Sequence, residues 1–207
     1  GSLVKTRGLY RGIMEDIYST YTTAATGTAF PFTDVAETRW SYPYIKELYD
    51  AGVVSGTSAT TFSPAANVTR AQFVTMLAGL AGADVSNCPA TPFRDVPEGA
   101  WYAPYVNWAL ANGIVSGTSA VTFSPDASIT RQDMAVMLYS YTQRFQVHLQ
   151  QQQPVKPFTD AGSIAAYAQI AVQTLQRAGV ISGMPDGSFQ PYGTATREQA
   201  CTMLCML

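Results

Sequence analysis

The sequence predicts a mainly α-helical protein in which three tandem helix-loop-helix repeats pack together as one pseudo-threefold bundle, trefoil or spindle in shape. A Pro-Phe-x-Asp segment, a Ser-Gly pair and a Thr-Arg pair recur three times, in this order, in the 207-residue chain. In every copy the arginine lies fourteen positions after the Ser-Gly glycine. Motifs that recur in register at a fixed spacing are typical of a repeat architecture. We therefore assign repeats to residues 31–83, 92–145 and 157–207.

Residues 1–30 precede the repeats and contain the first expected element. Gly1-Ser2 resembles a vector-derived remnant. Apolar residues then step by four along the chain: Leu9, Ile13, Ile17 and Tyr21. This spacing predicts an amphipathic helix of about five turns. Two interpretations remain open: the helix packs against the bundle or joins it to another domain, or its apolar face binds a partner or a membrane surface.

The first helix of each repeat is predicted by apolar residues at positions i, i+1, i+4 and i+5, which share one helical face. The first copy shows the pattern in Tyr44, Ile45, Leu48 and Tyr49. Each stretch ends at a glycine, the residue that best adopts a left-handed carboxy-terminal cap. These glycines are Gly52, Gly113 and Gly179. A short apolar pair and the Ser-Gly pair follow.

The second helix of each repeat is predicted by a threonine cap with a partner three positions later. The pairs are Thr69 with Gln72, Thr130 with Asp133, and Thr196 with Gln199. This is a capping box, or close to one in the second copy. Apolar spacing continues there through Phe145 and Leu149, which predicts a longer helix. One helix pair cannot bury its own apolar stripe, so three pairs are expected to pack together.

Composition excludes several functional classes. Twelve basic and 14 acidic residues give a net charge of −2, so the broad basic face needed for nucleic-acid binding is missing. No apolar run approaches the roughly 20 residues of a membrane span, and we expect no membrane insertion. The odd number of cysteines is no disulfide framework, and Cys201 and Cys205 are interpreted as packed, unreactive thiols. Because His148 has no second ligand at metal spacing, no metal or other cofactor is indicated.

The candidate site begins with three arginines that directly follow the threonine caps: Arg70, Arg131 and Arg197. The amino end of a helix carries partial positive charge and unpaired N–H groups, so a cation there is unfavourable by roughly some tenths of a kcal/mol. All three copies share this arrangement. We therefore expect a negative group beside each arginine.

Two negative partners fit these arginines, and they are not exclusive. One is an internal carboxylate that would hold copy to copy, supplied by Asp34, Asp95 or Asp160. The other is an external carboxylate or phosphate, since an arginine fork beside a helix amino terminus suits such an anion. In that case the helix N–H groups and the arginine would hold the anion together.

Two tryptophans recur near the start of the first helix. Trp40 and Trp101 each lie six positions after the aspartate of their copy. They either pack at the start of the first helix or stack on the ring of a ligand. At the same offset the third copy has Ala166, with Tyr167 beside it. We therefore expect the binding groove of the third copy to be weaker or inactive.

The Ser-Gly glycines complete the candidate ligand-binding set: Gly56, Gly117 and Gly183. They either serve turns that need a positive φ or let a ligand approach the backbone. No catalytic residue is predicted. The paired carboxylates of Glu15-Asp16 lie outside the repeats, and no nucleophile with a base or metal constellation is present.

The motifs together resemble the S-layer homology module. The resemblance covers residues 31–207 and rests on Phe-x-Asp, Gly-(Val/Ile)-(Val/Ile)-x-Gly, Phe-x-Pro and Thr-Arg-x-(Glu/Gln/Asp). It implies a non-catalytic anchor on the bacterial cell surface that binds a secondary cell-wall polysaccharide. Such polymers commonly end in a pyruvylated amino-sugar, which carries a carboxylate, and the family associates the Ser-Gly glycine with the groove. The family usually has glutamate where this chain has Gln72, Asp133 and Gln199.

Two functional interpretations follow. The first is a cell-wall anchor whose clefts between copies bind the acidic glycan, with the aspartates taking sugar hydroxyls. The second is a purely structural assembly module that contacts other surface-layer subunits. An enzyme is disfavoured, although an attached catalytic domain would lie outside these residues.

Overall fold

The structure is a computed structural model that describes residues 29–151, 154 and 156–207. Its compact unit, Phe32–Leu207, is helical, and the described residues contain no β-strand. The first helices of the three copies are α2 (Tyr42–Asp50), α4 (Ala103–Ala111) and α6 (Gln169–Arg177). The second helices are α3 (Arg70–Leu80), α5 (Arg131–Arg144) and α7 (Arg197–Cys205). The predicted mainly α-helical, three-repeat fold is confirmed, whereas the amphipathic helix expected in residues 1–30 lies outside the described residues.

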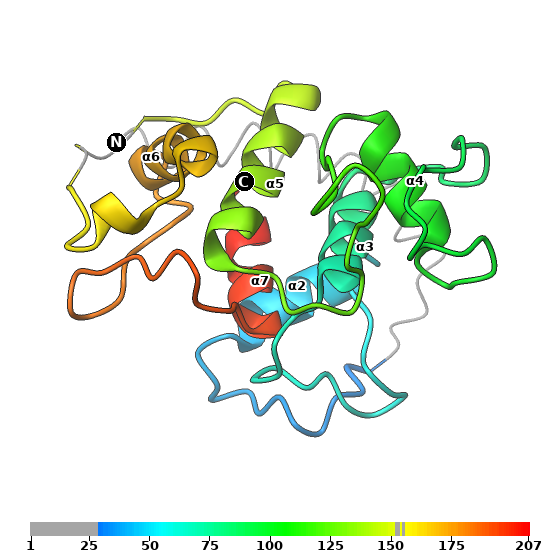
Figure 1. Ribbon diagram of the computed structural model, residues 1–207. Coiled ribbons are helices and arrows are strands. Elements are labelled where there is room, and N and C mark those ends of the chain that lie inside the picture. Colours follow the sequence, from blue (N-terminus) through cyan, green and yellow to red (C-terminus); the bar gives the residue numbers. More distant parts are fainter. Residues whose placement is uncertain (1–28, 152–153, 155) are drawn as a thin grey trace. The chain divides into compact units, whose positions relative to one another are not determined.

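Each copy exchanges a helix with its neighbour. Helix α4 packs on α3, α6 packs on α5, and α2 packs on α7, so a first helix always lies on the second helix of the preceding copy. The first copy closes the ring by packing on the third. Helix α3 also contacts α5 and α7, and in Figure 1 α4 and α6 lie on either side of these three helices. The result is three lobes, each built from two copies.

The middle of the ring is a triangle of backbone hydrogen bonds. The residues that precede the threonine caps are Val68, Ile129 and Ala195, all with 0% exposure. The N–H of Val68 donates to Ala195 O at 3.0 Å, that of Ala195 to Ile129 O at 3.4 Å, and that of Ile129 to Val68 O at 3.0 Å. Because each bond joins two different copies, the triangle places the starts of α3, α5 and α7 together.

The predicted helix ends are confirmed. Gly52, Gly113 and Gly179 have φ values of +71°, +69° and +74°, the left-handed conformation of a carboxy-terminal cap. Each threonine cap accepts a hydrogen bond from the N–H three positions later. Helix α5 is the longest of the second helices, with 14 residues against 11 and 9. It nevertheless ends at Arg144, so the extension predicted through Leu149 was too long.

The end of α5 is held by aromatic packing. The ring of Phe145, the residue after the helix, lies 4.8 Å from that of Tyr141 and 6.1 Å from that of Trp108, centroid to centroid. The apolar pattern beyond Arg144 therefore reflects packing of the turn against α4 and α5 rather than further helix.

An ion pair lies at the seam between the first and third copies. Arg39 donates from Nε and Nη2 to the two carboxylate oxygens of Glu198, at 2.8 and 2.9 Å. The hydroxyl of Ser41 donates to the same carboxylate at 2.6 Å. Although burial opposes ionisation of Glu198, these hydrogen bonds lower its pKa below the ordinary value. Residues from opposite ends of the repeat region are thereby joined directly.

Candidate functional site

The three arginines grip the loop of the next copy. Arg70, Arg131 and Arg197 are only 5%, 4% and 4% exposed. Each Nε donates to a phenylalanine carbonyl oxygen of the following copy, with the third copy returning to the first. The pairs are Arg70 with Phe123 at 2.8 Å, Arg131 with Phe189 at 2.7 Å, and Arg197 with Phe62 at 2.9 Å. Each guanidinium also lies over the ring of that phenylalanine, 4.5 to 5.1 Å from its centroid.

Loop carbonyl oxygens accept hydrogen bonds from the N–H groups at the positive amino ends of the second helices. In α3 the first two N–H groups donate to Ala127 O and Pro125 O, at 2.9 and 3.0 Å. The equivalent carbonyl oxygens of the other two loops accept from the first two N–H groups of α5 and α7. In each helix the threonine cap accepts from the third N–H. The expectation that these N–H groups hold a ligand carboxylate was therefore wrong, because protein oxygens already occupy them. Burial lowers the pKa of all three arginines from its ordinary value.

The repeated aspartates bind the same loops from the other side. Asp34 accepts hydrogen bonds from the N–H groups of Phe62 and Ser63 at 2.8 and 2.7 Å. Asp95 and Asp160 make the equivalent pairs, with Phe123 and Ser124 and with Phe189 and Gln190. The second residue of each pair has a φ of 56° to 58°, a left-handed conformation that is unfavourable for a side chain. Each carboxylate therefore stabilises a strained loop.

The arginine and the aspartate thus bind the backbone of the same loop phenylalanine and do not form an ion pair with each other. The aspartate accepts a hydrogen bond from the N–H of the loop phenylalanine in its own copy, and the arginine of the preceding copy donates to the carbonyl oxygen of that phenylalanine. Among the described residues no ion pair joins these arginines to Asp34, Asp95 or Asp160. The internal pairing expected from the sequence is absent in that form, because both groups bind backbone.

The Ser-Gly glycines lie against the Phe-x-Asp phenylalanine. A Cβ added to Gly56 would lie 2.4 Å from both Phe32 Cε1 and Ser58 O. The equivalent Cβ at Gly117 or Gly183 also lies within 3.0 Å of a phenylalanine carbon and a loop carbonyl oxygen. Only Gly117, with φ of +82°, has the left-handed conformation. Close approach of protein atoms, more than turn conformation, accounts for glycine at these positions.

The tryptophans are exposed at the starts of their helices. Trp40 is 55% and Trp101 60% exposed, so neither is packed away at the helix start. Counted back from the carboxy-terminal glycine of the helix, each lies twelve positions earlier, and Tyr167 has the same distance to Gly179. Tyr167 is 61% exposed. The third copy has one more residue after its aspartate, so Tyr167, and not Ala166, takes the tryptophan position.

Tyr167 and Arg70 meet at Asp133. The hydroxyl of Tyr167 donates to Asp133 Oδ1 at 2.7 Å, and Arg70 Nη1 donates to Oδ2 at 3.3 Å. Burial of the hydroxyl, followed by its bond to Asp133, raises the pKa of Tyr167 to about 12, so the phenol stays a donor at neutral pH. Sequence reasoning treated Asp133 only as a capping partner and missed this role.

A sequence signal for Asp133 exists. Gln72 and Gln199 close their capping boxes by accepting from the N–H of the threonine, at 3.2 and 3.0 Å. Asp133 stands at the same helical position but makes no such bond, since its side chain is one methylene shorter and its carboxylate faces Arg70 and Tyr167. The third helical position is therefore an acid in the second copy and a glutamine in the other two, and this difference marks a place where the copies have different contacts.

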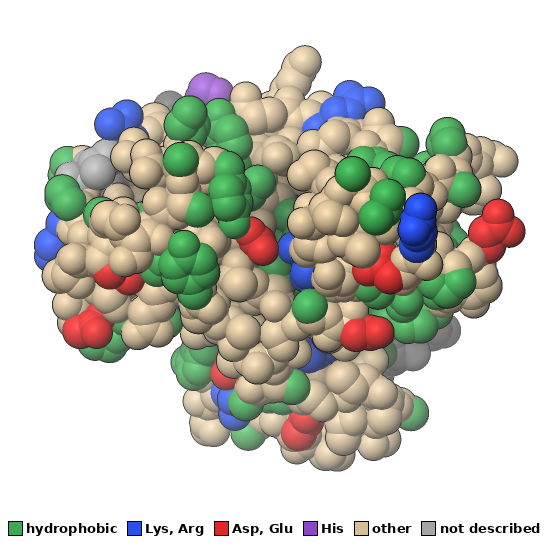
Figure 2. Space-filling model, in the orientation of Figure 1, with side chains coloured by type: hydrophobic (Ala, Val, Ile, Leu, Met, Phe, Trp, Pro, Cys, Tyr) green, Lys and Arg blue, Asp and Glu red, His purple; other side chains and the backbone are tan. Residues whose placement is uncertain are grey.

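Three inter-lobe sites can now be defined. The Tyr167 site consists of Tyr167, Asp133 and Arg70. Applying the equivalence of the copies, the Trp40 site consists of Trp40, Gln199 and Arg131, and the Trp101 site consists of Trp101, Gln72 and Arg197. In Figure 2 the surface is hollowed between the regions over α6 and α4, and both basic and acidic side chains are visible there.

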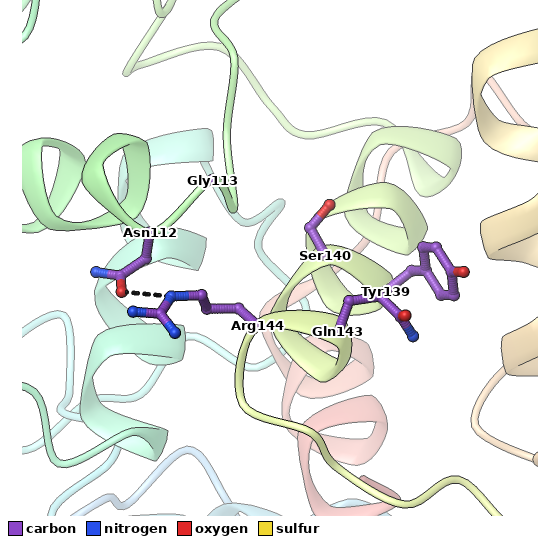
Figure 3. Close-up of a pocket in the computed structure, with 6 residues that line it drawn as sticks. All are labelled: Asn112, Gly113, Tyr139, Ser140, Gln143 and Arg144. Carbon is purple, nitrogen blue, oxygen red and sulfur yellow. Dashed lines mark hydrogen bonds between the residues drawn. The ribbon is translucent and has the colours of Figure 1, made fainter.

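A separate surface pocket lies at the carboxy-terminal end of α5, whereas Arg131 begins the helix. It has a volume of about 340 Å³ and is lined by residues from the end of α4 and the last turns of α5. Figure 3 shows Arg144 reaching across to Asn112, whose Oδ1 accepts a hydrogen bond from Arg144 Nε at 3.0 Å. None of the residues predicted for ligand binding lines this pocket.

Other kinds of site find no support in the part of the chain that is described. There, no group of three or more His, Cys, Asp or Glu side chains is placed to hold a metal ion. No helix between residues 29 and 207, within the described ranges, is long and apolar enough to cross a membrane. Burial raises the pKa of the Cys201 and Cys205 thiols to about 12, which makes them unreactive.

Sequence comparison identifies the repeats. The S-layer homology domain profile matches residues 31–74, 92–135 and 157–201, one match in each copy. The chain belongs to the S-layer homology domain family. The arginine clamps, that is the hydrogen bonds from Arg70, Arg131 and Arg197 to the loop phenylalanines, lie within the matched S-layer homology segments. The aspartate-bound loops lie within them too.

Relatives of this S-layer homology region occur in proteins of several kinds. An endoglucanase of Bacillus sp. (strain KSM-635) is 39% identical over 91% of this chain and 20% of its own length. A cellulosome-anchoring protein of Acetivibrio thermocellus is 28% identical over 74% of this chain and 35% of its own. An S-layer protein of Bacillus thuringiensis subsp. finitimus is 27% identical over 87% of this chain and 21% of its own. The chain therefore spans only about a fifth to a third of these relatives, and the family places it at the bacterial cell surface.

Proposed function

We propose that this chain is a non-catalytic module that anchors a protein to the bacterial cell wall by binding an acidic secondary cell-wall polysaccharide. The ligand-bearing surfaces are the three inter-lobe sites, and the glycan that the module binds ends in a pyruvylated amino-sugar. The proposal rests mainly on one observation, the aromatic side chain that each lobe leaves more than half exposed at the same position. Tryptophan and tyrosine are enriched at interfaces, because one part of the side chain is apolar and another can form hydrogen bonds.

Stacking is the first contribution to binding. The rings of Trp40, Trp101 and Tyr167 have apolar faces of the size of a sugar ring, with polar edges available for hydroxyl groups. Because each ring is 55% to 61% exposed, a saccharide covers apolar surface that the fold itself leaves in water.

Charge is the second contribution. Arg131 and Arg197 donate to backbone carbonyl oxygens, and no carboxylate in the described residues lies at ion-pair distance from either. Asp160 and Asp34 act on Arg131 and Arg197 electrostatically, but neither aspartate pairs with its arginine. A ligand carboxylate beside such a guanidinium is attracted more strongly than in water, because the arginine is desolvated. The buried arginine acts chiefly through this field, since little of its surface is available for contact.

The relatives support anchoring over catalysis. One relative is named a cellulosome-anchoring protein and another an S-layer protein, and both share this region. Enzymes such as the related endoglucanase carry the region as a small part of a much longer chain. A shared module attached to different activities fits a common task of attachment.

Calorimetry with purified acidic wall polysaccharide tests this function. We expect Trp40→Ala and Trp101→Ala to weaken binding by about fivefold each, since an aromatic contact contributes about 1 kcal/mol. Both side chains are exposed, so the melting temperature should change little. Val121→Ala, which removes an apolar side chain of 39% exposure outside these sites, is the control.

Two results would contradict the proposal. One is unchanged affinity in the double tryptophan variant. The other is a wild-type chain that ignores the polysaccharide but self-associates through the same tryptophans, which would instead favour an assembly module for surface-layer subunits.

A further inference from the structure

The three inter-lobe sites differ in charge. In the Tyr167 site the guanidinium of Arg70 is paired with Asp133, whose side chain is 28% exposed. In the other two sites the third helical position holds a glutamine that is turned back to its own threonine cap. Arg131 and Arg197 make their additional hydrogen bonds to the carbonyl oxygens of Ser182 and Ser55, at 3.3 and 2.9 Å. Among these described residues, only the Tyr167 site therefore has a carboxylate paired with its arginine, whereas Asp160 and Asp34 act on Arg131 and Arg197 without pairing with them.

The Tyr167 site also gains a second exposed aromatic ring. Tyr192 is 65% exposed, and its neighbours on both sides are bound to the start of α5. Pro191 O accepts from Gln132 N at 3.0 Å, and Gly193 O accepts from Arg131 N at 2.8 Å. Asp133 follows directly on the same helix, so Tyr192 and Tyr167 are both held at this helix start. The equivalent positions in the other loops are Ala65, which has no ring, and Asp126, an exposed acid of the Trp101 site that makes no ion pair with Arg197.

We infer that the three sites divide the glycan between them: the Trp40 and Trp101 sites take its acidic units, whereas the Tyr167 site takes an uncharged sugar unit. Asp133 is the residue that determines this specificity. The inference rests on the function proposed above and goes further, because it assigns a different ligand charge to each site.

Electrostatics supports the division. A ligand carboxylate in the Tyr167 site would lie near Asp133, a like charge, and would find Arg70 already paired. A sugar hydroxyl, in contrast, can donate to the lone pairs of Asp133 that Tyr167 and Arg70 leave free. Two tyrosine rings offer stacking faces for a neutral ring. In the other sites the arginine bonds to backbone carbonyl oxygens and has no paired carboxylate, which favours the acidic unit.

The test uses two synthetic probes, a pyruvylated amino-sugar and the same amino-sugar without the pyruvate ketal. Binding is followed through the indole N–H resonances of the three tryptophans, with Trp108, 5% exposed, as an internal control. Calorimetry gives the number of sites. We expect the wild type to bind two acidic sugars, which shift the Trp40 and Trp101 signals, and one uncharged sugar, which shifts neither.

Reciprocal substitutions at the third helical position make the test decisive. Asp133→Gln should add a third site for the acidic sugar. Gln72→Asp should remove the acidic sugar from the Trp101 site, weakening binding there at least tenfold while the Trp40 signal still responds. The fold tolerates aspartate at this position, as α5 demonstrates. Tyr192→Ala should weaken binding of the uncharged sugar about tenfold and leave the acidic sugar unaffected.

Failure of this inference differs from failure of the proposed function. Three acidic sugars bound by the wild type, or no change in the number of acidic sites in Asp133→Gln, would overturn the division between sites. So would uncharged sugar that does not bind or does not depend on Tyr192. If instead the wild type binds no acidic sugar and no acidic wall polysaccharide, the anchoring function itself is wrong.

Discussion

Arg70, Arg131 and Arg197 place a cation where a helix is already positive, and the structure provides the physical reason. Each side chain brings two kinds of partner together, a carbonyl oxygen and the ring of the same phenylalanine. The oxygens replace water around a nearly buried charge, so the unfavourable helix dipole is offset by hydrogen bonds between copies. These residues therefore contribute to stability as well as to the charge of the proposed binding sites.

Arg197→Ala should lower the free energy of unfolding by about 3 kcal/mol, because the carbonyl oxygens of Phe62 and Ser55 lose their donors inside the protein. Urea denaturation measures the loss. Arg197→Lys should recover only part of it, since a lysine cannot reproduce the two directed bonds of the planar guanidinium. If alanine were as stable as arginine, the clamp would have no energetic role.

The residues of the candidate site could be selected from the sequence, but the groups that they contact could not. The exposed tryptophans, the arginines and the Ser-Gly glycines were found because they recur. What they contact was not predictable, since an arginine can be answered by a carboxylate, by a ligand or by backbone, and sequence spacing does not distinguish among these. Tyr167 was missed as the third aromatic because counting from Asp160 ignores one inserted residue.

At the scale of elements, the loop between the two helices of a copy is fixed by side-chain hydrogen bonds to its backbone. In the second copy the two oxygens of Asp95 accept from consecutive N–H groups at Phe123 and Ser124, 2.8 and 2.7 Å away. A turn with a positive φ at Ser124 is thereby stabilised without a glycine. The loop carbonyls are then positioned to receive the arginine and the helix N–H groups of the preceding copy.

Asp95→Asn should destabilise the protein by about 2 kcal/mol, because an amide has one acceptor oxygen and its NH₂ group would face an N–H donor. Thermal unfolding compared with Asp126→Asn, an exposed acid in the same copy, isolates the effect. The control should change stability by less than about 0.5 kcal/mol. Equal melting temperatures for the two variants would show that one oxygen is enough.

Helix boundaries were largely predictable, because the capping chemistry is local. Threonine caps and carboxy-terminal glycines fix each helix within its own few residues. The exception is α5, whose apolar pattern continues past its end because Phe145 packs on Tyr141 and Trp108. Periodicity alone does not separate a helical turn from a turn that packs.

At the scale of the whole molecule, three copies were predicted to pack as one bundle, but the exchange of helices between them was not. Each copy has the same apolar faces, so its first helix is equally suited to its own second helix and to that of a neighbour. The choice is made by contacts between copies, such as the arginine clamps and the central triangle of hydrogen bonds. These involve residues more than fifty positions apart in the chain.

The seam between the first and third copies should respond to pH through Glu198. Its pKa lies below the ordinary value of 4.5, so its contribution to stability is fully present above about pH 4.5 and is lost as the pH falls through the lowered pKa. We expect the difference in unfolding free energy between the wild type and Glu198→Gln to shrink on acidification from pH 7 to pH 3. Urea denaturation at several pH values measures it.

Arg39→Gln serves as the matched variant, since it removes the cation and leaves the acid. It should reduce the pH dependence as well, because the lowered pKa of Glu198 depends on that guanidinium. A constant difference between wild type and both variants across this range would show that the ion pair does not couple protonation to folding.

Because every lobe borrows a helix from the neighbouring copy, losing one copy by deletion would leave two helices without partners rather than one fewer independent unit. Under the proposed function, attachment strength could not be adjusted by trimming the repeat number. Single replacements inside the intact set of three, such as one at Asp133, would instead leave the architecture whole and alter what an inter-lobe site binds.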